Sequence, residues 1–147
     1  MQQGHDYAPV MAPTKPVCVP GEFVIAAAFA DHGHLFGMVS NLLAAGATLG
    51  YVYEPDESKA NKLLALDPAA KRVESFDAIL QAPDVRLVAA AAIPNLRAGI
   101  GIRVLQADKD YFTDKCPFTS LEQLEAVRQV VLATGRKYAV CFSERVQ

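Results

Sequence analysis

The stretch FVIAAAFADHGH, residues 23–34, decides the fold class of this sequence. Its first eight residues are apolar on both alternating faces, which is typical of a central strand that helices cover on both sides. After the polar turn, Leu35, Met38 and Leu42 recur at spacings of three and four, which indicates a helix with one buried face. A buried strand followed by such a helix is the basic unit of a parallel sheet.

The same alternation continues through the rest of the chain. Further apolar runs, separated by segments with helical periodicity or capping residues, lie at residues 48–53, 85–92, 111–113 and 137–142. Because right-handed crossovers join parallel strands of one sheet, this order predicts an α/β fold. We expect a doubly wound, Rossmann-like parallel sheet of about five or six strands, with helices on both faces.

Several residues are expected to mark helix ends. Asn95 is well placed to cap a helix on which Leu96, Ile100 and Val104 form one buried stripe. Thr119 and Glu122 form a capping-box pattern. Gly135 can take the left-handed conformation that closes a helix, so we expect the last helix to end there.

Composition excludes several classes of protein. The chain has 147 residues, the size of one domain, and a net charge of -2 with no basic run, which argues against a nucleic-acid partner. Its longest apolar stretch, residues 23–30, is far shorter than the roughly 20 residues of a membrane-spanning helix. The three cysteines are in no paired motif, so we expect no disulfide framework and a cytoplasmic location.

The chain is expected to consist of a short arm and one domain. Residues 1–21 contain four prolines but no charged start followed by a long apolar core, so they read as a flexible N-terminal arm and not as a secretory signal. Residues 22–147 are the expected nucleotide-binding domain.

The turn after the first expected strand is the first candidate site. Parallel sheets bind ligands outside the carboxyl ends of their strands, where the strand order reverses. This turn contains Asp31, His32, Gly33 and His34, and a helix that starts here favours an anion such as the pyrophosphate of a dinucleotide. Only one glycine stands in the turn, so the usual glycine fingerprint is essentially absent. A tight connection without a ligand is an equal alternative.

An acidic residue follows the second expected strand. Glu54 is placed to accept hydrogen bonds from the ribose of an adenosine. Its charge would disfavour the extra phosphate of NADP, which slightly favours NAD. An exposed loop carboxylate is the alternative interpretation.

The same turn contains residue types that bind metals. Asp31, His32 and His34 offer carboxylate and imidazole groups suited to zinc or iron. The only other histidine is His5, and no convincing third or fourth ligand follows in the sequence. We therefore predict no metal site, because a histidine pair at a helix start more often caps the helix or polarises a neighbour.

Four segments resemble one family of enzymes. Glu54-Pro-Asp56, residues 75–84, Ala92-Ile-Pro-Asn95 and Asp114-Lys-Cys-Pro117 are similar, in order and spacing, to motifs of the Gfo/Idh/MocA oxidoreductases, the glucose-fructose oxidoreductase and inositol dehydrogenase type. The third segment resembles the family's T-P-N segment and the fourth its E-K-P motif. The resemblance covers residues 23–145 and identifies them with the family's N-terminal NAD(P)-binding domain.

This resemblance implies roles for individual residues. Ile93, Pro94 and Asn95 would contact the dinucleotide, and Lys115 would be the active-site lysine beside the nicotinamide and the substrate's hydroxyl or carbonyl. A solvated surface lysine is the alternative for Lys115. The implied reaction is hydride transfer between NAD or NADP and a sugar, polyol or related carbonyl compound.

The sequence also departs from the family pattern. Phe29, Asp31 and His34 stand where the three fingerprint glycines would be, and Arg97 replaces a histidine that often follows the T-P-N segment. In the family a second, mainly antiparallel domain brings the catalytic histidine and acid, the substrate pocket and usually the interface of a homo-oligomer. That domain is absent from this chain, so we expect the chain alone to be inactive. A non-catalytic binding or regulatory module with a degenerate cofactor site is the alternative.

Overall fold

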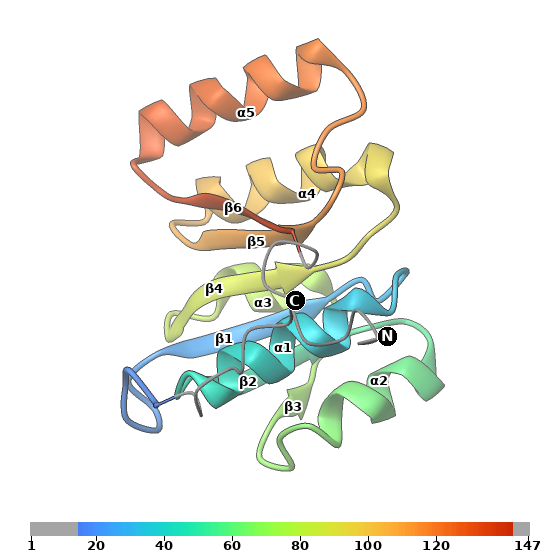
Figure 1. Ribbon diagram of the computed structural model, residues 1–147, viewed down its shortest axis with the longest axis vertical. Coiled ribbons are helices and arrows are strands. Elements are labelled where there is room, and N and C mark those ends of the chain that lie inside the picture. The colour runs from blue at the N-terminus through green and yellow to red at the C-terminus, as the bar shows by residue number, and fades with distance from the viewer. Residues whose placement is uncertain (1–14, 143–147) are drawn as a thin grey trace, which may run out of the picture.

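The computed structural model describes residues 15–142. They form a six-stranded sheet in the order β3-β2-β1-β4-β5-β6, in which every neighbouring pair is parallel. The elements are β1 (Val24–Ala28), α1 (His34–Ala44), β2 (Thr48–Tyr53), α2 (Glu57–Leu64), β3 (Lys71–Arg72), α3 (Phe76–Gln81), β4 (Val85–Ala90), α4 (Pro94–Gln106), β5 (Asp110–Asp114), α5 (Leu121–Thr134) and β6 (Tyr138–Cys141). The predicted doubly wound α/β fold is confirmed, and its strand order reverses between β1 and β4 (Figure 1).

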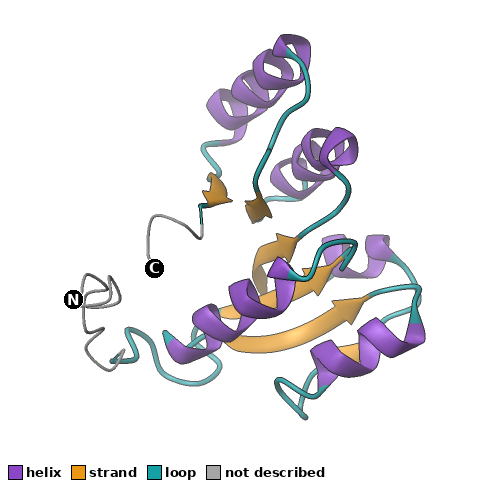
Figure 2. Cartoon of the chain, turned by 45° about the vertical axis from the view of Figure 1, so that its right-hand side comes forward, coloured by secondary structure: helices purple, strands orange, loops and turns teal. Residues whose placement is uncertain are grey.

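Strand β1 lies in the middle of the sheet and contributes to a core on each face. Ile25 and Ala27 pack with residues of α1 and α2, whereas Ala26 and Ala28 pack with residues of α3 and α4. Successive side chains of a strand point to opposite faces, so an unbroken apolar run suits this position. Figure 2 shows the helices distributed on both sides of the strands, as the sequence predicts.

Two expected helix caps are displaced by one or two residues. Helix α4 begins at Pro94, so the predicted capping role of Asn95 is wrong; proline suits a first helical position because its missing N–H would have no partner there. Helix α5 is capped by Ser120, which accepts a hydrogen bond from the Gln123 amide at 3.2 Å, and not by Thr119. Gly135 closes α5 with a φ of 68°, as predicted.

The shortest strand has no signal in the sequence. Strand β3 is a polar, exposed pair of residues that adds to the edge of the sheet beside Tyr51 and Val52. Two exposed residues are too few to show an alternating pattern. The strand extends the sheet without contributing to its core.

The described part of the N-terminal arm contacts the domain. Residues 1–14 of the predicted arm lie outside the described residues. The Val17 amide donates to the Ala45 carbonyl at 2.8 Å, and the Gly21 amide donates to the Thr48 hydroxyl at 2.8 Å. These bonds hold residues 17–21 against the end of α1 and the start of β2. Within residues 15–142, no helix has the length and apolar character needed to span a membrane.

Candidate functional site

The turn after β1 begins with a residue in a conformation that suits glycine. Phe29 has a φ of 57°, and its ring packs edge-on against Tyr53 and Phe76 at centroid distances of 5.4 and 4.9 Å. Its carbonyl accepts a hydrogen bond from the Ala91 amide at 3.2 Å. A left-handed backbone at a non-glycine residue costs of order 1–3 kcal/mol, which these aromatic contacts help to offset. The turn therefore keeps a glycine-like bend at the place of the first fingerprint glycine.

The next part of the turn lies against the start of α4. The Ile93 amide donates to Asp31 Oδ2 at 3.2 Å, which joins the loop after β1 to the loop after β4. Gly33 precedes α1 with a φ of -63°, and a Cβ at this position would meet no described atom within 4 Å. The turn thus leaves open space beside the first residues of α1.

The amino end of α1 lies near one negative group, the Asp114 carboxylate, whose Oδ1 is 3.0 Å from Nδ1 of His34, the first residue of the helix. The first turn of the helix contains no acidic residue, and Gly33, which precedes the helix, provides no side-chain cap. The His34 amide has only a long contact, 3.3 Å, with His32 Nδ1. The Leu35 and Phe36 amides donate to the carbonyls of His32 and Gly33 at 3.3 Å, so the helix dipole is what makes this end attractive to an anion.

Glu54 lies beneath the turn instead of projecting from it. Its side chain is buried, and its two carboxylate oxygens accept hydrogen bonds from the Ala30 amide at 2.6 Å and the Asp56 amide at 3.0 Å. The Glu54 carbonyl also accepts a bond from Arg72 at 3.0 Å. Glu54 thus fixes the loops after β1 and β2 to one another, and each carboxylate oxygen keeps a lone pair for a further donor.

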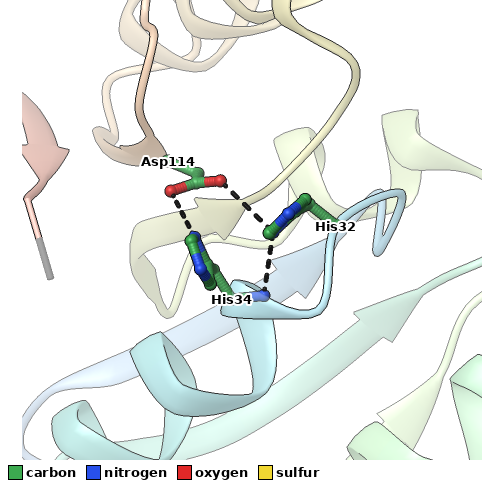
Figure 3. Close-up of side chains that lie close together, drawn as sticks. All are labelled: His32, His34 and Asp114. Carbon is green, nitrogen blue, oxygen red and sulfur yellow. Dashed lines mark hydrogen bonds and ion pairs between the residues drawn. The ribbon is translucent and has the colours of Figure 1, made fainter.

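Two histidines of the turn converge on an aspartate at the end of β5. His34 Nδ1 lies 3.0 Å from Asp114 Oδ1, and His32 Nδ1 lies 3.6 Å from Asp114 Oδ2. Figure 3 shows the imidazole rings of His32, on the loop after β1, and of His34, at the start of α1, with the Asp114 carboxylate facing them. The sequence places only Asp31 next to the two histidines, whereas the fold brings Asp114 close to both.

Arg97 occupies the opposite side of the Asp114 carboxylate. Both side chains are only 3% exposed, and Arg97 Nη2 lies 3.4 Å from Asp114 Oδ2. The guanidinium also donates to the carbonyls of Ala92 at 2.6 Å and Cys116 at 3.1 Å. Burial raises the pKa of the neighbouring Tyr138 hydroxyl, which stays protonated and contacts the Arg97 carbonyl at 3.5 Å. Arg97 therefore ties together the ends of β4 and β5.

This role of Arg97 is not expected from the sequence. Leu96 is expected on the buried stripe of α4, but this residue is 49% exposed and Arg97 is buried instead. The substitution of a family histidine by Arg97 was the one available signal. Its partner Asp114 is the residue that replaces the glutamate of the E-K-P motif.

The loop ends enclose one small pocket of about 220 Å³. Its lining consists of Asp31, His32, His34, Ala92, Ile93, Pro94, Arg97, Asp114 and Lys115. The structure thus brings together most of the predicted site residues, including Lys115, which follows β5 and precedes a cis peptide bond to Cys116. Glu54 and Asn95 lie outside this lining, and Gly33 lies in the adjoining turn.

A comparison with protein families gives one match. Residues 25–142 match the model of an oxidoreductase family with an NAD-binding Rossmann fold. Among proteins of curated function, none matches the chain. The matched range includes the whole sheet except Val24, the first residue of β1, and it includes every residue that lines the pocket.

Several solved structures are similar to this chain. A protein described as an oxidoreductase, from Erwinia carotovora atroseptica, is 40% identical with a TM-score of 0.79; the match covers 84% of this chain and 37% of that one. GenD2 from gentamicin A biosynthesis, solved with NAD, is 15% identical with a TM-score of 0.74, covering 89% and 37%. A mutant of KijD10, a 3-ketoreductase from Actinomadura kijaniata, solved with NADP and TDP-benzene, is 18% identical with a TM-score of 0.71, covering 82% and 38%. This chain therefore spans little more than a third of the length of these proteins.

Proposed function

Because this chain belongs to the Gfo/Idh/MocA family of oxidoreductases and is an NAD(P)-binding Rossmann domain, we propose a function in hydride transfer. The hydride would pass to or from a sugar, polyol or related carbonyl compound. The observation that supports this proposal best is the pocket at the reversal of strand order between β1 and β4. It joins an uncapped helix start to a lysine at the end of β5. The predicted cytoplasmic location and homo-oligomeric assembly are part of the same proposal.

The proposal assigns each part of the cofactor to a part of the site. The pyrophosphate would lie on Asp31, His32, Gly33 and His34, at the amino end of α1. The adenosine ribose would lie near Glu54, whose carboxylate already orders the adjoining loops and whose charge favours NAD over NADP.

The nicotinamide would lie toward the loop after β4 and the lysine. Ile93, Pro94 and Asn95 would contact the ring, and Lys115 would polarise the substrate oxygen that gains or loses a proton. When bound, the dinucleotide supplies the hydride chemistry, while the protein supplies binding and orientation. Turnover is proposed for a protein in which this domain acts with a second, substrate-binding domain.

Removal of one charge tests the pyrophosphate position. We expect Asp31→Asn to bind NAD⁺ about fivefold more tightly than the wild type, because two unit charges about 4 Å apart interact by about 1 kcal/mol in water. The asparagine carbonyl can still accept the Ile93 amide bond. Isothermal titration with NAD⁺ and NADP⁺ measures the change, and Asp84→Asn, which removes an equal charge before the other end of β4, is the matched control.

Two outcomes of this titration would count against the assignment. Equal gains in Asp31→Asn and Asp84→Asn would indicate a general charge effect and no pyrophosphate at the turn. Absence of binding by every variant up to millimolar cofactor would favour the second candidate function, a non-catalytic binding or regulatory module. The observation behind that candidate is the placement of Phe29, Asp31 and His34 where fingerprint glycines would stand.

A further inference from the structure

The groups around His32, His34 and Asp114 have the chemistry of a metal site. Each residue offers one ligand atom, and these atoms lie within 4.8 Å of one another. Two imidazoles and one carboxylate are ligands that zinc and iron(II) use in sites where the protein supplies three ligands and leaves a position open. The aspartate is buried, so it is unlike the exposed acidic groups that commonly lack an ion.

The three groups lie close enough to share one ion, and the His34–Asp114 pair is also at hydrogen-bond distance, 3.0 Å. His32 Nδ1 and Asp114 Oδ2 are 3.6 Å apart, too far for a direct hydrogen bond. Two ligands of a tetrahedral ion with bonds of about 2.1 Å lie about 3.4 Å from one another. His32 Nδ1 has a single lone pair, which faces the His34 amide at 3.3 Å, so an ion bound to this nitrogen would replace that contact.

The surroundings hold the carboxylate in place for this role. Arg97 contacts Asp114 Oδ2, and Oδ1 is the oxygen nearer His34. Outer partners of this kind orient ligating carboxylates in metal sites. Asp31 lines the same pocket and adds a second negative charge near the proposed ion.

We propose that His32, His34 and Asp114 bind one divalent transition-metal ion of the zinc class. The remaining coordination positions would face the pocket that Lys115 lines, and would take an oxygen donor of the small molecule bound there, either a hydroxyl or carbonyl or a phosphate oxygen. Such an ion acts as a Lewis acid on the oxygen that it binds. The proposal is independent of cofactor binding, because the three protein ligands alone define the ion site.

Titration of the purified, metal-free chain with Co²⁺ tests the site without any cofactor. We expect one ion per chain, a visible d–d absorption band of a low-symmetry site, and its loss when Zn²⁺ is added. His32→Gln and His34→Gln should each weaken Co²⁺ binding by about tenfold or more. Loss of a residue that only hydrogen-bonds a metal ligand already weakens binding by about tenfold to a hundredfold. Both histidine side chains are partly exposed, so these variants are expected to fold, which circular dichroism verifies.

Two control variants separate this site from adventitious binding. His5→Gln removes the remaining histidine, and Cys116→Ser removes an exposed thiol close to the pocket; both should bind Co²⁺ as the wild type does. Binding that survives unchanged in both cluster variants, or that is lost in either control, would overturn the assignment. The assignment would also be overturned if the wild-type chain bound neither Co²⁺ nor Zn²⁺ when each ion, tested separately, was mixed at millimolar concentration with an equal concentration of chain.

The occupied site can then distinguish the two oxygen sources. Addition of NAD⁺ changes the Co²⁺ spectrum if a phosphate oxygen completes the shell, whereas a polyol changes it if a hydroxyl does so. If neither compound altered the Co²⁺ spectrum, the ion would have no coordination position open to a small molecule. Its role would then be limited to stabilising the fold.

Discussion

Replacing Asp114 with alanine is expected to lower the free energy of unfolding by about 3–5 kcal/mol. The Arg97 guanidinium would remain buried, 3% exposed, without the carboxylate that compensates its charge. Its bonds to the Ala92 and Cys116 carbonyls satisfy donors but do not neutralise the charge. Urea unfolding followed by circular dichroism measures the loss.

A surface ion pair provides the matched control for this change. Asp77 lies 2.6 Å from Arg103, but the side chains are 65% and 49% exposed. Since water screens such pairs, Asp77→Ala should cost at most about 1 kcal/mol. Equal losses in the two variants would contradict the view that Arg97 and Asp114 form a buried, mutually dependent pair.

The second large effect is expected inside α4. A Cβ at Gly101 would lie 2.4 Å from Tyr138 Cε2 and 2.8 Å from Tyr111 Cδ1. The Tyr111 ring is fully buried and the half-buried Tyr138 ring packs edge-on against it at 5.1 Å, so neither ring can move away without disturbing other contacts. Gly101→Ala should therefore destabilise the domain by about 1–3 kcal/mol, as overpacking of a core does.

The same helix contains its own control. A Cβ at Gly99 would meet no described atom within 4 Å, and the residue is exposed. Gly99→Ala should stabilise the domain by up to about 1 kcal/mol, because alanine is the better helix former. A gain in both variants, measured by urea unfolding, would show that the rings accept the extra methyl group and would refute the packing argument.

Much of the fold could be predicted because its signals are local. The apolar run at β1 determines its central position, and the helical spacing of Leu35 and Met38 determines the face of α1 that is buried. The parallel pairing of the strands then follows, because a helix that joins two parallel strands of one sheet makes a right-handed crossover. The predicted stripe on α4 was wrong at Leu96, because the ion pair with Asp114 draws Arg97 inward in its place.

The candidate site could be predicted only in part. Its turn and Lys115 follow from the position of the first strand and from the E-K-P resemblance. The contact of His34 with Asp114 joins residues 80 positions apart, and no spacing within the sequence indicates it. The use of both Glu54 oxygens by backbone amides also depends on how two loops meet. Contacts of this kind arise from tertiary structure alone.

Nuclear magnetic resonance tests most directly whether the loops after β1 and β4 form the dinucleotide site. Titration of the ¹⁵N-labelled chain with NAD⁺ should shift the amide resonances of His32, His34 and Asn95. The amide of Lys109, before the opposite end of β5, should not move. Shifts that concentrate around Lys109, or no shifts up to millimolar NAD⁺, would contradict the account.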